Sequence, residues 1–446
     1  MGRSFRASAP PSRRGQVGKS HFPKRTAAFL MNILSKIPLD RNWVWSFADQ
    51  GLILASAVFS VTFLIPRLGP AQYGAWAALF ALLGPFSALA HAGVTLTILE
   101  CIVRDDQDIF SVSRSCVTVA LLLSGLMAPI VTVAGSFWIE SVGFKLFALF
   151  VFSELLVAAV LHSIIAIVQG ARSYPKAIAL KLGLTSFRIA VLLLLVMFHS
   201  VSIENLVLAN AMMLFLATLL GYLAASKLGL GPIVPGRIRL GHLRTAITYG
   251  LGIGSAIAQN DGDKVVLNAY GHHVDSGLYA VAYRLASILM MPLAAFLASS
   301  HFAVLQSSRN SSNQLRKALV FSAATAAYAL PALGCLALAA PLVPRILGEE
   351  FYEASVIVQL VAPIAIIRFL GAFASNGLLG LRQNLLRTWI LVASATLSLV
   401  LYVLLIPAYS WKGALVASLI SEVALFVSCW IGLYICQRRA NLLPQP

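Results

Sequence analysis

Four basic residues lie inside long apolar segments of the chain: Arg188, Lys264, Arg284 and Arg368. A charge at the centre of a bilayer costs on the order of 3 kcal/mol even on insertion-based scales, so these side chains should face a cavity or another helix. Arginine can hold a phosphate group through two parallel hydrogen bonds. Two roles stay open: contact with an anionic substrate, or ion pairing with acidic residues of the apolar segments. Those acidic residues are Asp261, Asp263, Glu154 and Glu422.

Segment 258–268, AQNDGDKVVLN, is the most polar stretch inside any of the long apolar segments. Its polar side chains recur every three or four residues and therefore fall on one face of a helix. They are Asn260, Asp261, Lys264 and Asn268. Segment 43–66 has a milder polar stripe that includes Asp49 and Gln50. These stripes either line a cleft between the two helices or join helices to one another inside the bilayer.

Three acidic residues, Asp49, Glu154 and Glu422, are candidates for coupling to protons or to cations such as sodium. Asp49 lies near a segment end, where simple solvation is the alternative. The sequence contains no nucleotide-binding motif, no nucleophile signature and no metal-ligand spacing, and its five cysteines suit packing roles. We therefore expect no catalytic residue, no metal site and no cofactor.

Composition places these residues in a membrane protein. Of 446 residues, 59% are hydrophobic and only 11% are charged, against about 45–50% and 25% in soluble domains. A soluble fold could not bury that much apolar surface. The net charge of +17 would suit nucleic acid in a soluble protein, but here the basic residues lie in the N-terminal tail and between apolar segments. Membrane topology explains that distribution, and no nucleic-acid partner is expected.

The chain contains twelve apolar segments long enough to cross a bilayer, which needs roughly 20 residues. They are 43–66, 74–100, 114–136, 146–170, 176–198, 203–225, 245–269, 278–304, 316–340, 353–379, 387–406 and 412–436. The loops between them are short and contain no soluble domain. The sequence therefore predicts an all-α integral membrane protein with about twelve transmembrane helices.

The charges between these segments predict the orientation. If both termini are cytoplasmic, 25 basic residues lie on the cytoplasmic side and four on the opposite side. Those four are Arg67, Lys145, Arg345 and Lys412. Because basic residues concentrate on the cytoplasmic side of membrane proteins, we expect both termini to be cytoplasmic.

Five regions follow along the chain. Residues 1–42 are a basic tail, partly disordered, that can lie on anionic lipid, with Met31 as an alternative start. Residues 43–225 form a first half of six helices, and 245–436 form a second half. Residues 226–244 are a cytoplasmic linker and 437–446 a cytoplasmic tail.

Two segments of the chain resemble each other across the two halves. RLGPAQYGAWAALFALL (67–83) and AYGHHVDSGLYAVAYRLASIL (269–289) each have a glycine, a short turn, a second glycine, an aromatic residue and an alanine-rich helix. Gly69 and Gly74 correspond to Gly271 and Gly277. The repeat predicts two pseudo-symmetric six-helix halves around a central cleft, where transporters of this kind bind substrate.

Four segments resemble the Wzx-type polysaccharide-biosynthesis (O-antigen and exopolysaccharide) flippases of the multidrug/oligosaccharidyl-lipid/polysaccharide exporter (MOP) superfamily. Residues 47–77 resemble the first helix and Leu-Gly-Pro turn of that family, and 263–286 resemble its mid-chain Gly-Leu-Tyr segment. Residues 341–364 and 406–426 resemble its ninth-to-tenth helix connection and its last helix pair. HFAVLQ (301–306) departs from the family, which often has a Phe-Pro pair there.

The resemblance implies a multi-pass transporter of the bacterial inner membrane, not an enzyme. It would move a polyprenyl-pyrophosphate-linked oligosaccharide for polysaccharide biosynthesis by alternating access, with Arg188, Lys264, Arg284 and Arg368 as cations that bind the substrate in the cleft. Candidates for lining this cleft or for coupling are Asp49, Gln50, Asn260, Asp261, Asp263, Glu154 and Glu422.

The partners that the resemblance implies are the lipid-linked glycan, membrane lipids, and the polysaccharide polymerase and export machinery. Three alternatives stay open. A MATE-like drug or cation antiporter and a lipid II-type flippase would share the fold. A membrane glycan polymerase would need a larger extracytoplasmic loop than this chain has.

Overall fold

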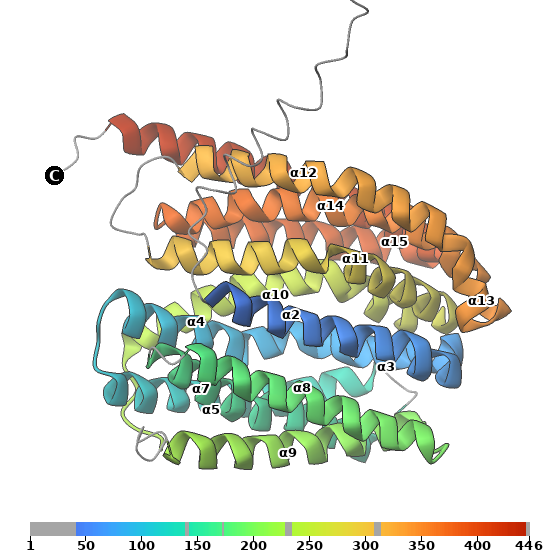
Figure 1. Ribbon diagram of the computed structural model, residues 1–446, viewed down its shortest axis with the longest axis horizontal. Helices are drawn as coiled ribbons and strands as arrows, with labels where there is room; N and C mark the ends of the chain where they lie inside the picture. Colours follow the sequence, from blue (N-terminus) through green and yellow to red (C-terminus); the bar gives the residue numbers. More distant parts are fainter. Residues whose placement is uncertain (1–41, 139–141, 172–173, 228–233, 307–313, 443–446) are drawn as a thin grey trace, which may run out of the picture. The chain divides into compact units, whose positions relative to one another are not determined.

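The computed structural model describes residues 42–138, 142–171, 174–227, 234–306 and 314–442, and its regular elements in these ranges are all helices (Figure 1). The predicted tail 1–42 lies outside these ranges except for its last residue, as do residues 443–446. The final helix continues to Leu442, past the predicted end at 436.

The first half contains α-helices that are interrupted by short π-helical segments. The π-helical segments are η1 (Ser60–Leu64), η2 (Ala88–Ala92), η3 (Glu100–Arg104) and η4 (Ser153–Val157). The α-helices are α2 (Asn42–Phe59), α3 (Ile65–Ser87), α4 (Gly93–Leu99), α5 (Ile109–Ser136), α6 (Phe144–Phe152), α7 (Ala158–Gly170), α8 (Tyr174–Met197) and α9 (Ile203–Lys227).

The described ranges of the second half contain α-helices without π-helical segments. These are α10 (Leu240–Ala269), α11 (His273–Gln306), α12 (Gln314–Ala339), α13 (Val343–Leu347), α14 (Tyr352–Gly380) and α15 (Asn384–Leu442). Short 3-10 turns, Ala340–Leu342 and Glu349–Phe351, flank α13.

The number of membrane-crossing helices agrees with the prediction. Nine helical stretches within the described ranges are long and apolar enough to cross a membrane. Two of these stretches each contain two helices, because the backbone turns at Gly69 (φ 70°) and at Ser410 (φ 49°). α10 is long enough, at 30 residues, but too polar to be counted by composition. Counting each divided stretch as two helices and adding α10 gives twelve crossing helices.

The repeated glycines of the two halves meet one another. Gly69 and Gly271 have the same left-handed backbone, with φ of 70° and 80°. A methyl group on Gly74 would lie 2.7 Å from the backbone nitrogen of Gly277, and one on Gly277 would overlap the carbonyl oxygen of Pro70. Only glycine permits this backbone approach, which resembles the small-residue crossings of membrane helices. The two repeated segments therefore pack directly against each other.

α10 packs along α3 and α4 of the first half and along α15 of the second. Glycines make the first contact close: a methyl group on Gly250 would lie 2.9 Å from the Leu89 Cα, and one on Gly254 would lie 2.8 Å from the Pro85 carbonyl oxygen. Four polar side chains in the C-terminal part of α10 are consequently buried, namely Gln259, Asp263, Lys264 and Asn268. This position explains how a helix too polar to be recognised by composition can lie within the membrane.

Candidate functional site

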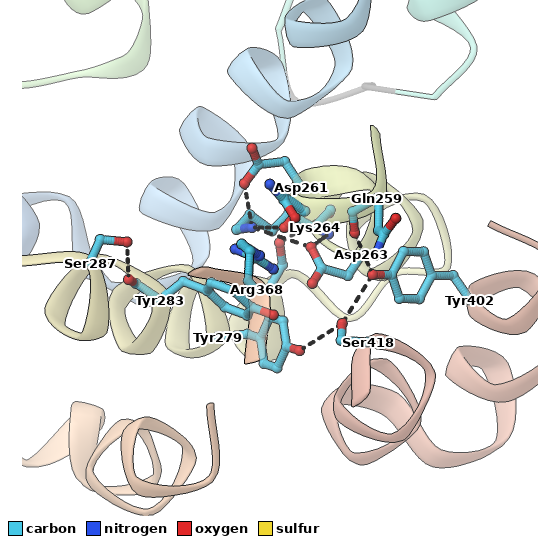
Figure 2. Close-up of polar contacts among 12 residues, drawn as sticks. Gln259, Asp261, Asp263, Lys264, Tyr279, Tyr283, Ser287, Arg368, Tyr402 and Ser418 are labelled. Atoms are coloured by element: carbon cyan, nitrogen blue, oxygen red, sulfur yellow. Dashed lines mark hydrogen bonds and ion pairs between the residues drawn. The ribbon is translucent and has the colours of Figure 1, made fainter. Parts of the chain in front are cut away.

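Lys264 of α10 is the centre of a polar cluster inside the second half (Figure 2). Its Nζ lies 2.7 Å from Asp261 Oδ1 and 3.2 Å from Asp263 Oδ1, and it donates to the Asn260 carbonyl oxygen at 3.1 Å. The same ammonium lies 4.5 Å from the ring centre of Tyr283 on α11. The predicted polar face of α10 thus brings its members into direct contact.

The two carboxylates that pair with Lys264 have different environments. The Asp263 side chain is fully buried, and its Oδ1 also accepts the backbone N–H of Lys264 at 2.8 Å. The Asp261 side chain is 42% exposed. Asp263 is therefore the carboxylate whose burial depends most strongly on the lysine, because an unpaired buried charge is costly.

Arg368 of α14 forms the second ion pair of this cluster. Its Nε donates to Glu422 Oε1 of α15 at 2.8 Å, and the Glu422 side chain is only 1% exposed. The guanidinium carbon lies 5.6 Å from the centre of the Tyr283 ring, which Lys264 also contacts. Tyr283 thus joins the two ion pairs through cation–π contacts.

A layer of hydroxyl groups beside the ion pairs holds α10, α11 and α15 together (Figure 2). The Tyr402 hydroxyl donates to the Gln259 carbonyl oxygen at 2.6 Å and lies 3.0 Å from Ser418 Oγ. The Tyr279 hydroxyl lies 3.5 Å from the same serine. The sequence prediction missed these tyrosines, although Tyr279 and Tyr283 share one helical face in an otherwise apolar segment.

Several buried polar atoms of this region have no hydrogen-bond partner among the residues that the structure describes. They are Gln259 Nε2 and Oε1, Asp263 Oδ2, Asn268 Nδ2, Tyr283 OH and Glu422 Oε2. Buried polar atoms in proteins are nearly always hydrogen-bonded, so these atoms have capacity for water or a bound group. Within the described ranges, no group of three His, Cys, Asp or Glu side chains is placed to hold a metal ion.

Arg284 and Arg188 extend the positive charge toward the first half. Arg284 follows Tyr283 on α11, is exposed, and lies within electrostatic range of Arg188 on α8. The Arg188 guanidinium lies 5.8 Å from the ring centre of Phe80 and within electrostatic range of Glu154. Glu154 Oε1 accepts a 2.7 Å hydrogen bond from Asn210 Nδ2.

The candidates on α2 form a separate group. Asp49 and Gln50 are half-buried, and Asp49 lies within electrostatic range of Lys181 on α8. α2 packs against α8 and α11, whereas α10 packs against α3, α4 and α15. Their predicted role in lining a cleft shared with α10 stays a prediction.

The chain belongs to the polysaccharide biosynthesis protein family, whose sequence profile matches residues 67–356. No significant match is found among curated proteins. Similar solved structures cover most of the chain at low identity, and they show the fold.

One of these solved structures is that of a MATE multidrug transporter, DinF-BH, in complex with R6G. Its TM-score is 0.67 at 13% identity, and the match covers 89% of this chain and 96% of that one. An inward-facing MATE transporter of the MOP superfamily gives 0.65 at 14% identity, covering 89% and 99%. An outward-facing one gives 0.62 at 13% identity, covering 89% and 96%. The fold is thus that of transporters of the MOP superfamily, as the sequence resemblance predicted, and the helices are those of a multi-pass membrane protein.

Proposed function

We propose that this chain is a flippase of the bacterial inner membrane that moves a polyprenyl-pyrophosphate-linked oligosaccharide for polysaccharide biosynthesis. The observation that carries the proposal is the set of accessible guanidinium groups inside the membrane-crossing bundle. Arg284 is exposed, Arg188 is half-buried, and the Arg368 side chain is 24% exposed. Arginine is well suited to bind pyrophosphate, because its planar fork matches two phosphate oxygens.

The arrangement of the carboxylates supports an anionic substrate. Asp263 and Glu422 are almost completely buried, so they neutralise Lys264 and Arg368 from the protein side. The more accessible carboxylates are Asp261 and Glu154. Three accessible arginines facing two such carboxylates leave an excess of positive charge where a substrate would enter.

The two-half architecture supports alternating access. In transporters built from repeats, substrate sites lie near the bilayer midplane at the junction of the halves, and rocking of one half against the other changes access. Arg188 belongs to the first half and Arg284 to the second, so a pyrophosphate between them would be attracted by both halves. Asp49, Glu154 and Glu422 are the acidic groups we propose for coupling to a proton or sodium ion.

The proposed orientation has both termini in the cytoplasm. The end of the bundle with residues 234–239 and the start of α10 would then be cytoplasmic, and the end with α13 would be periplasmic (Figure 1). Reporter fusions after residues 108, 235 and 310 should be cytoplasmic, and fusions after 70, 273 and 350 periplasmic. Two or more inverted reports would contradict this orientation.

The function is tested by deletion of the gene in its host and complementation with single variants. Deletion should stop surface polysaccharide export and leave the lipid-linked precursor in the cytoplasmic leaflet. Arg284→Ala should lower export at least tenfold at normal membrane abundance, whereas Arg368→Ala should lower membrane abundance as well, because it leaves the buried Glu422 without its cation. The matched control is Arg345→Ala, an exposed arginine on α13, which should export normally.

Other outcomes identify other functions. Normal polysaccharide with altered resistance to cationic drugs would favour an antiporter of the MATE type. Accumulated peptidoglycan precursor would favour a lipid II-type flippase. Either result would overturn the proposal.

A further inference from the structure

A polar pocket lies at the opposite end of α10 from the linker. It has a volume of about 480 Å³, within the range of about 300–1,000 Å³ for small-ligand sites. Its lining comes from the turn between α10 and α11, the first turn of α14 and the bend in α15. The residues are His272, Asp275, Glu353, Ala408, Tyr409, Ser410, Trp411 and Lys412.

The bend in α15 gives this pocket its form. Ser410 has φ 49° and ψ −131°, a conformation that residues other than glycine rarely adopt. Its hydroxyl donates a hydrogen bond to Asp275 Oδ2, and Asp275 in turn lies 4.0 Å from His272 Nδ1. A methyl group on Gly413 would overlap the Leu405 carbonyl oxygen, so the chain reverses tightly here. Strained residues that are held in this way cluster at binding sites.

The side chains around the bend combine aromatic rings with hydrogen-bonding groups. Tyr409 is 63% exposed, and Trp411 is half-buried with the Lys412 ammonium 5.6 Å from its ring centre. Glu353 and Lys412 are exposed. Rings offer flat apolar faces, carboxylates accept hydrogen bonds from hydroxyls, and the ammonium donates to ring and hydroxyl oxygens.

We propose that this pocket binds a sugar unit of the transported glycan on the periplasmic side, an inference that rests on the proposed function for the identity of its ligand. A free phosphate fits poorly, because Asp275 and Glu353 would repel it. An organic cation fits poorly at the tryptophan, because Lys412 already occupies that position. A hydroxyl-rich, uncharged sugar ring fits better, because its hydroxyls can donate to the carboxylates and accept from the Lys412 ammonium.

The pocket is connected to the polar cluster through adjacent residues. Ser276, next to Asp275, donates from its hydroxyl to the Lys264 carbonyl oxygen at 3.2 Å. Glu353 and Arg368 lie on the same helix, α14. A glycan whose pyrophosphate leaves the arginines would therefore find the pocket on its route out of the bundle.

Titration of the purified full-length protein in lipid nanodiscs tests this inference. The probe is the free oligosaccharide repeat released from the polysaccharide that the host exports, which has no lipid and no pyrophosphate, and saturation-transfer NMR measures its dissociation constant. The wild type should bind it saturably, and Trp411→Ala and Glu353→Gln should each weaken binding at least tenfold. Because Glu353 is exposed, Glu353→Gln should fold normally, so it can test the inference even if Trp411→Ala does not fold.

The matched control is Trp138→Ala, at the same end of the bundle and 47% exposed. If Trp411 only anchors the protein at the membrane interface, both tryptophan variants will behave alike, which overturns the inference. Absence of saturable binding to the wild type also overturns it, as does binding of rhodamine 6G that depends on Glu353 and is not displaced by the oligosaccharide. If deletion stops export but the wild type binds no sugar, only this inference fails. Sugar binding in a protein whose deletion leaves export intact would contradict the proposed function alone.

Discussion

α2 and α10 occupy equivalent positions in the two halves, yet their side chains have different environments. Each leads into a left-handed glycine, Gly69 and Gly271. α10 has thirteen buried residues, including Lys264 and Asp263, whereas Ala57 is the only buried one among the α2 side chains that the structure describes. The two halves therefore share a backbone arrangement at this position, whereas the ion-pair network of Lys264 and Arg368 lies in the second half.

The halves also differ in helix regularity. All four π-helical segments in the described ranges, η1 to η4, belong to the first half. Such segments shift the helical register and often mark functional regions or hinges. The comparison suggests a division of labour, with a regular second half that holds the buried ion pairs of Lys264 and Arg368 and a first half that can change shape around them.

The largest effect is expected from Lys264→Ala. It leaves the fully buried Asp263 without its cation, and breaking a buried pair costs about 3–5 kcal/mol. Membrane abundance and the thermal midpoint of the purified protein should fall. Adding Asp263→Asn should restore both, and adding Asp261→Asn should restore less, because Asp261 is partly exposed. Equal rescue by the two second-site changes would contradict this assignment.

Gly250→Leu should have the next largest effect. The new side chain would press on the backbone of Leu89, and overpacking costs about 1–3 kcal/mol. Gly51→Leu in α2 is the matched control, because nothing lies within 4 Å of a methyl group there. Thermal unfolding of both variants measures the difference. Similar losses in both would show that α2 is packed as tightly as α10.

Much of the fold could be predicted from the sequence. Twelve apolar segments of sufficient length predicted twelve crossing helices, and the glycine repeat predicted two halves whose repeated segments meet at Gly74 and Gly277. The spacing of Asp261 and Lys264 predicted their shared face, because helical periodicity is a local property.

Features that depend on tertiary contacts were not accessible from the sequence. The Arg368–Glu422 pair joins residues on two helices far apart in the chain, and no local pattern specifies which acid faces which base. Burial of Asp263 depends on how α10 packs between α3 and α15. The sequence predicted a break between 406 and 412, where the bend in α15 lies, but no glycine or Asn there indicates the positive φ of Ser410.

Tyr402→Phe should have a moderate effect on stability. It removes the hydroxyl that donates to the Gln259 carbonyl oxygen and contacts Ser418, a loss of about 1 kcal/mol. Tyr434→Phe, on the same helix but exposed, should change nothing. Chemical denaturation in detergent measures both. An unchanged Tyr402→Phe variant would show that the hydroxyl layer does not stabilise the second half.

The smallest stability effect is expected from Asp49→Asn on α2. The side chain is half-buried, and surface-type changes usually stay within about 0.5 kcal/mol. If Asp49 couples transport to protons, export should still become independent of external pH. If the variant unfolds instead, Asp49 must belong to a charge network that stabilises α2, like the one on α10.

A binding measurement tests most directly whether the accessible arginines bind the pyrophosphate of the substrate. Native mass spectrometry of the purified protein with undecaprenyl pyrophosphate measures the bound fraction for the wild type, Arg284→Ala and Arg345→Ala at equal concentration. We predict one bound lipid for the wild type and for Arg345→Ala, and at least a tenfold lower bound fraction for Arg284→Ala. Equal occupancy in all three proteins would contradict the account.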